Sequence, residues 1–119
     1  MKKMTERLQH MRRDLGADLA SDVALLARSL DDKGEDMTVS QHPADVASDL
    51  YAREELVAEE RVLEAELADV EDALARIANG TYGVCLACGS AIPLARLDAR
   101  PQAGRCIECE RLAERALRR

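Results

Sequence analysis

Four cysteines carry the clearest chemistry in this sequence of 119 residues. Cys85 and Cys88 form one CxxC pair, and Cys106 and Cys109 form a second pair after 17 intervening residues. Thiols grouped in this way could form two disulfides, a redox centre or a metal site. Two CxxC pairs about 15 to 20 residues apart are typical of structural zinc, whose four ligands form a tetrahedron.

The setting of the cysteines favours the metal site. A redox CxxC usually lies next to alternating strands and helices, and this sequence shows no such alternation. No apolar run approaches the roughly 20 residues that span a bilayer, and residues 1–14 carry positive charge without the apolar segment of a secretory signal. We therefore expect a cytoplasmic protein, in which disulfides are disfavoured. The prediction is one structural Zn²⁺ held by all four cysteines, with no position open for a catalytic water.

Two long helices are predicted before the cysteines. The first begins near Met4 and carries an apolar stripe that drifts after Leu15, with Gly16 as a weak point. A polar, acidic segment at residues 31–45 is predicted to be a loop, because it contains Gly34 and Pro43. The predicted stripe of the first helix is Met4, Leu8, Met11, Leu15, Leu19, Val23, Leu26 and Leu30.

The second helix is predicted from Pro43 to about Ala78, where the sequence NGTYG ends it. Steps of four and three residues place an apolar heptad seam along it, and Arg53 and Glu60 interrupt the seam toward its beginning. The seam residues are Leu63, Leu67, Val70, Leu74 and Ile77. The first helix offers a partner stripe, so we expect an antiparallel hairpin. The alternative is that each helix pairs with a second copy of the chain.

The expected fold is therefore mainly α. Residues 1–79 would form an antiparallel coiled-coil hairpin with an acidic tip around residues 31–47. Residues 80–119 would form a C4 zinc-finger globule in which Gly89 permits a tight turn and the second cysteine pair opens a C-terminal helix. A bound metal would explain how a segment with few aromatic residues can fold.

Charge is distributed unevenly along the chain. Residues 31–80 contain four basic and 15 acidic side chains, a balance of −11, whereas residues 81–119 contain seven basic and four acidic ones, a balance of +3. An acidic middle repels nucleic-acid phosphates. An enzyme is not expected, because the two histidines, His10 and His42, belong to no nucleophile–base arrangement in the sequence and the zinc site is closed.

The cysteine segment resembles the DksA/TraR family of bacterial transcription factors. The resemblance lies in YGVC before the first cysteine pair, in RLDARP between the pairs, and in the four cysteines with Gly89 and Ile92. The hairpin that precedes them completes the family's architecture. The resemblance implies a protein that binds RNA polymerase without recognising a promoter sequence. In this family the coiled coil enters the secondary channel, and the tip alters initiation there, often with the stringent-response alarmone ppGpp.

The resemblance also indicates which residues to consider at the tip. The family's tip motif, Asp-Pro-x-Asp-x-Ala, corresponds here to residues 42–47, so Asp45 and Ala47 match and His42 replaces the first aspartate. We expect these three residues to contact polymerase. Asp45 also fits a structural role as a carboxylate at a helix start.

The family's ppGpp-binding positions are only partly kept. Arg96 and Arg100 are candidate contacts for the channel rim or ppGpp, and Arg100 matches a family arginine implicated in that binding. The family lysine after the last cysteine is Glu110 here, and Asp69 lies near a position that is basic in responsive members. Acidic groups repel a polyphosphate, so a weak response to ppGpp, or none, is expected.

Two other functions fit the same pattern. One is a nucleic-acid-binding zinc module on a helical arm, which would need an exposed basic face and salt-sensitive DNA binding. The other is a stress or assembly adaptor that shares the fold but has another target.

Overall fold

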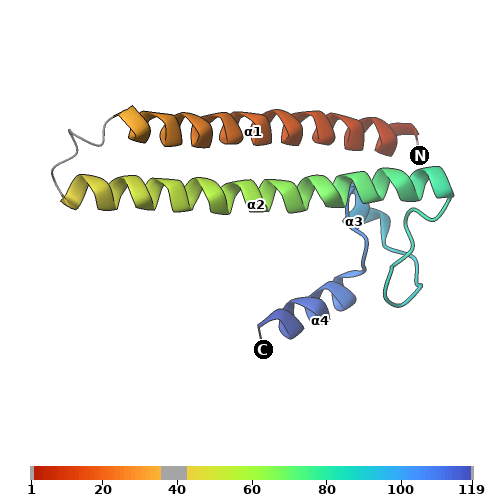
Figure 1. Ribbon diagram of the computed structural model, residues 1–119. Coiled ribbons are helices and arrows are strands. Elements are labelled where there is room, and N and C mark those ends of the chain that lie inside the picture. The colour runs from red at the N-terminus through yellow and green to blue at the C-terminus, as the bar shows by residue number, and fades with distance from the viewer. Residues whose placement is uncertain (1, 36–42, 119) are drawn as a thin grey trace. The chain divides into compact units, whose positions relative to one another are not determined.

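The computed structural model describes the backbone of residues 2–35 and 43–118, and the side chains of residues 2–28 and 47–118. This part of the chain contains four helices and no β-strand beyond an isolated bridge between Val84 and Ala91 (Figure 1). The helices are α1 (Lys2–Glu35), α2 (Pro43–Asn79), α3 (Leu94–Ala99) and α4 (Ile107–Leu117). The mainly α fold is thus confirmed. None of the described helices is long and apolar enough to cross a membrane.

The ends of α2 follow from its sequence. Pro43 is its first residue, where the missing N–H costs no hydrogen bond. At the other end Gly80 adopts φ 75°, and two backbone hydrogen bonds close the helix, from Gly80 N to Ile77 O at 3.2 Å and from Thr81 N to Arg76 O at 2.8 Å. This is a Schellman motif, which needs a residue with positive φ just after the helix. The predicted stop at NGTYG is confirmed.

Helix α1 is longer than the sequence suggested. It continues to Glu35. The prediction of a loop from residue 31 onward is therefore wrong for residues 31–35, which are helical. One glycine inside a helix costs only about 1 kcal/mol relative to alanine, and Gly34 is followed by a glutamate that favours the helix. Residues 36–42 of the predicted loop lie outside the described residues.

By their internal contacts the residues form two compact units. Unit 1 comprises Met1–Arg13 and Leu67–Arg119, and unit 2 comprises Asp14–Glu66. Each unit therefore contains a segment of α1 and a segment of α2, and the segments run antiparallel within it. The division into a hairpin of residues 1–79 and a globule of residues 80–119 stays a prediction.

Unit 1 holds the best-packed core. Leu8 of α1 and Val70 and Ala73 of α2 are fully buried. The segment after α2 adds its own small core, made of Tyr82, Ile92, Leu97 and Ala103. Burial raises the pKa of Tyr82, which therefore stays protonated and donates a hydrogen bond from its hydroxyl group to the carbonyl oxygen of Pro101 at 2.8 Å.

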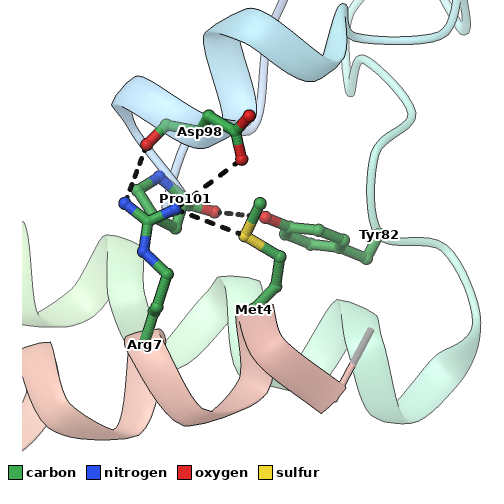
Figure 2. Close-up of polar contacts among 5 residues, drawn as sticks. All are labelled: Met4, Arg7, Tyr82, Asp98 and Pro101. Atoms are coloured by element: carbon green, nitrogen blue, oxygen red, sulfur yellow. Dashed lines mark hydrogen bonds and ion pairs between the residues drawn. The ribbon is translucent and has the colours of Figure 1, made fainter.

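Polar contacts join the first turns of α1 to the segment around α3, as Figure 2 shows. Arg7 donates a hydrogen bond to the backbone oxygen of Asp98 at 2.7 Å and contacts the sulfur of Met4. Its ion pair with the Asp98 carboxylate is longer, at 3.8 Å, and largely exposed, so this pair adds little by itself. The hydrogen bond to the carbonyl joins α3 to the beginning of α1 within unit 1.

Unit 2 has a more polar seam than the sequence predicted. Val23, placed in the apolar stripe, is 46% exposed, so that prediction is wrong. Asp22 is buried instead, with 9% of its surface exposed. In a heptad pattern the seam position after Leu19 is three residues further on, at Asp22, and not four residues further on, at Val23. This register places the acidic side chain of Asp22 between the helices.

The Tyr82 hydroxyl group offers a test of the small core in unit 1. We expect Tyr82→Phe to lower the stability of unit 1 by about 1–3 kcal/mol, because the buried Pro101 carbonyl loses its hydrogen-bond donor. Thermal unfolding followed by circular dichroism measures this change. Tyr51→Phe is the matched control, because Tyr51 is 65% exposed. Equal melting temperatures for the two variants would contradict the assignment.

Candidate metal centre

The four cysteines come from two short segments of unit 1. Cys85 and Cys88 lie in the turns before α3, whereas Cys106 is the N-cap of α4 and Cys109 lies in its first turn. All four sulfur atoms lie within 4.8 Å of one another. The Sγ atoms of Cys88 and Cys106 are 3.8 Å apart, which is the separation that a tetrahedral site with Zn–S bonds of about 2.3 Å requires.

Backbone hydrogen bonds close the turn that carries the first pair. Gly89 adopts φ 75°, a conformation that favours glycine, and its N–H donates to the Cys85 carbonyl at 3.0 Å. The Cys85 N–H donates to Ser90 O at 2.8 Å. The predicted role of Gly89 is thus confirmed. The Leu86 N–H donates to the Gly104 carbonyl at 2.8 Å and links this turn to the segment that leads to the second cysteine pair.

The protonation of the thiols is set by their neighbours. Backbone N–H groups of Cys88 and Cys106 lower the pKa of Cys85 to about 6. Hydrogen bonding with the side chains of Cys106 and Cys85 raises the pKa of Cys109 to about 12. Four sulfur atoms this close cannot all be anionic without a compensating charge, and a bound dication provides that charge.

The donor set therefore fits one structural Zn²⁺. All four donors are cysteine sulfur atoms in the geometry of a closed site, in which the metal supplies folding energy and has no open coordination position. Cys85 is buried with 2% of its surface exposed, whereas Cys88 is exposed. The zinc ion predicted from the sequence is confirmed as the cofactor of this module. Within the described residues, no other group of three or more potential metal ligands gathers in this way.

A pocket of about 520 Å³ lies beside the metal centre in unit 1. Its charged lining contains both signs, so we call it the mixed-charge pocket. Both arginines singled out from the sequence line it, and Arg96 also donates a hydrogen bond from Nε to the Arg105 carbonyl at 2.9 Å. The charged residues of the lining are Arg76, Arg96, Arg100, Arg105, Asp69, Asp72, Glu110 and Glu114.

Sequence reasoning missed Arg76 in this pocket. One terminal nitrogen of its guanidinium group is buried without a hydrogen-bond partner among the described residues, as is the side-chain oxygen of Gln102. Arg76 lies directly before the seam residue Ile77 on α2. This position beside the seam was the only indication in the sequence that the Arg76 side chain could be buried. Asp69, Arg100 and Glu110, which were compared with the family's ppGpp positions, all line the same pocket.

The predicted tip residues are described only in part. His42 lies outside the described residues. Asp45 belongs to the first turn of α2, although its side chain is outside the description, and Ala47 is exposed on the next turn. Their contacts with polymerase stay a prediction.

Loss of one sulfur ligand tests the metal centre. We expect Cys88→Ser to lose bound zinc and to unfold the segment around α3 and α4, because zinc binding contributes about 10–16 kcal/mol in small zinc-dependent folds. Metal content and circular dichroism of the purified protein measure both effects. Leu94→Ser is the control, since Leu94 is 76% exposed in the same segment. Unchanged zinc content and ellipticity in Cys88→Ser would overturn the assignment.

The sequence is similar to that of several known proteins. Residues 80–115 match the model of the prokaryotic dksA/traR C4-type zinc finger. The chain is 42% identical over 73 residues to the uncharacterized protein YteA of Bacillus subtilis, covering 61% of this chain and 30% of YteA. It is 32% identical over 112 residues to the RNA polymerase-binding transcription factor DksA of Haemophilus influenzae, covering 92% of this chain and 75% of that protein.

The fold is also found in a solved structure. The transcription factor DksA2 from Pseudomonas aeruginosa superimposes with a TM-score of 0.76 at 27% identity, and the match covers 99% of this chain and 85% of DksA2. The chain spans less than a third of YteA, but its similarity to the two DksA proteins extends over both the helices and the zinc finger. This protein therefore belongs to the DksA/TraR family of C4-type zinc-finger proteins.

Proposed function

We propose that this protein binds RNA polymerase and regulates transcription initiation by inserting the tip of its helical hairpin into the secondary channel, without sequence-specific DNA binding. The observation that carries the proposal is the similarity over 112 residues to a protein named RNA polymerase-binding transcription factor DksA. That similarity includes the helices as well as the cysteines. A zinc finger alone would not favour this function over another.

The metal centre and its surroundings suit a docking role. Helix α4 begins at the zinc ligands and exposes apolar side chains, with Leu112 at 61% and Leu117 at 87% exposure. These two side chains are available for contact with a protein partner. Residues 31–80 carry a balance of −11, so the hairpin repels nucleic-acid phosphates while it can approach cationic protein surfaces.

The arrangement of the arginines argues against the nucleic-acid-binding alternative. Arg96, Arg100 and Arg105 line the mixed-charge pocket together with carboxylates from α2 and α4. Arg96 is also engaged with the Arg105 carbonyl. A nucleic-acid interface needs cationic groups free to neutralise phosphates, and nearby carboxylates oppose that role.

The same pocket bears on the response to ppGpp. Asp69 and Glu110 share the pocket with Arg100, and carboxylates at this range repel the phosphates of a polyanion. We therefore propose that the protein acts on polymerase with little or no dependence on ppGpp, as a regulator and not as an enzyme.

The tip carboxylate gives the first functional test. Asp45→Ala is expected to reduce the effect of the protein on run-off transcription from a ribosomal RNA promoter severalfold, while its affinity for the cognate polymerase changes less than about twofold. The reason is that tip contacts act inside the channel, whereas most of the docking surface lies elsewhere. Asp49→Ala, one turn further along α2, is the control. Parallel loss of binding and effect would contradict a tip-specific role.

The pocket gives the second test. Binding of labelled ppGpp to polymerase should not increase when the wild-type protein is added. The double variant Asp69→Lys, Glu110→Lys should increase it severalfold, because two repulsive charges become attractive ones. A double variant with glutamines at the same positions separates loss of repulsion from gain of attraction. A severalfold increase with the wild-type protein would refute the proposed independence.

A further inference from the structure

Two walls of the mixed-charge pocket in unit 1 carry opposite charges. Glu110 and Glu114 lie one turn apart on α4 and make its contribution to the lining acidic. Arg96, Arg100 and Arg105 come from α3 and from the segment that joins α3 to α4, and they make that wall basic. A molecule in the pocket therefore meets carboxylates on one element and guanidinium groups on another.

Helix α2 contributes charges of both signs to the same pocket. Asp69 and Asp72 are followed one turn later by Arg76, and all three line the pocket from one face of the helix. The whole lining then contains four arginines and four carboxylates, so its formal charge is zero. Neither an anion nor a cation is favoured by the net charge of this site.

The charges of the pocket are not paired with one another. Within the described part of the chain, no ion pair joins any two of these eight side chains, and Arg96 alone among them donates a side-chain hydrogen bond, to the Arg105 carbonyl. Ion pairs form when a basic nitrogen and a carboxylate oxygen lie within about 4 Å of each other. Because the pocket holds its opposite charges further apart, they are available to a bound molecule.

A glycine keeps room for the guanidinium group of Arg76. A Cβ atom at residue 104 would lie 3.0 Å from Cδ1 of Leu86 and 3.4 Å from Nη2 of Arg76. This Nη2 atom and the Oε1 atom of Gln102 are buried without hydrogen-bond partners among the described residues, and both residues line the pocket. An unpaired buried donor or acceptor is costly. A bound molecule that carries an acceptor and a donor can pair with both atoms after small rotations of these side chains.

We propose that the mixed-charge pocket binds a small zwitterion, in which a short chain joins a carboxylate to an ammonium group. The carboxylate pairs with the arginines, whose guanidinium groups offer two parallel N–H donors, and the ammonium group pairs with the carboxylates of α2 and α4. A simple anion is repelled by four carboxylates and a simple cation by four arginines. The volume of about 520 Å³ lies within the range of small-molecule sites, about 300–1,000 Å³.

The pocket lies wholly within unit 1, so this binding requires no polymerase. Failure of the pocket to bind a zwitterion would leave the proposed function standing. Asp69, Asp72 and Glu114 are exposed, so solvent screens their charges and each pair adds little energy. We therefore expect a dissociation constant of about 1 mM, which rises with salt concentration.

An NMR titration of the full-length, zinc-loaded protein tests the ligand class. The probes are β-alanine, γ-aminobutyrate and ε-aminocaproate, which separate the two charges by increasing lengths. At least one of them should saturably shift the Nε–H signals of Arg76, Arg96 and Arg100, whereas caproate, hexylamine and inorganic phosphate should bind severalfold more weakly at equal ionic strength. No saturable shift with any zwitterion up to about 50 mM would overturn the proposal, because the expected affinity is about millimolar. Equal binding of a simple anion or a simple cation would overturn it too.

Variants on opposite walls test the location. Arg100→Gln and Glu114→Gln each remove one charge from the lining, so both should weaken binding of the best zwitterion severalfold. Arg111→Gln and Glu71→Gln are the matched controls, because both residues are exposed and lie outside the lining, and they should leave the affinity unchanged. Zinc content equal to that of the wild type shows that each variant keeps its metal centre. An affinity that changes equally in all four variants, or in none, would refute binding in this pocket.

Discussion

The convergence of four cysteine sulfur atoms on one point is the constraint on which the C-terminal part of this protein depends. The sulfur atoms lie within 4.8 Å of one another, and only a shared cation makes four thiolates stable at that distance. The segments from Cys85 and from Cys106 are thereby held together. Beneath them the core is small, consisting mainly of Tyr82, Ile92, Leu97 and Ala103, which is too little apolar surface to fold such a segment without a metal.

The two units differ in how their helices are held together. In unit 1 the helices bury Leu8, Val70 and Ala73 completely, and the hydrogen bond from Arg7 to the Asp98 carbonyl adds the zinc-binding segment to the same unit. In unit 2 the seam includes the buried Asp22. A buried carboxyl group gains less from burial than an apolar side chain does. The seam of unit 2 therefore contributes less to stability at this position than the apolar contacts of unit 1.

Much of this structure follows from short sequence signals with a direct physical cause. Pro43 and Asn79–Gly80 set the ends of α2, because proline fits a first helical turn and glycine accepts positive φ. The cysteine spacing and Gly89 predict the metal centre for similar reasons. Val23 was placed in the seam incorrectly, and the burial of Asp22 was not predicted, because the register of a seam depends on the partner helix. Arg76 was missed because its burial depends on segments distant in sequence, and the end of α1 was misplaced because glycine only weakens a helix.

Photo-crosslinking to RNA polymerase distinguishes a hairpin tip that enters the secondary channel from one that stays outside it. Ala47 is exposed near the start of α2, so p-benzoyl-phenylalanine can replace it without disturbing the core or the cysteines. After irradiation with the cognate RNA polymerase, mass spectrometry locates the crosslinked residues. The proposed function predicts crosslinks to residues that line the secondary channel near the catalytic centre. Crosslinks confined to the outer surface of polymerase, obtained with a folded and bound protein, would contradict it.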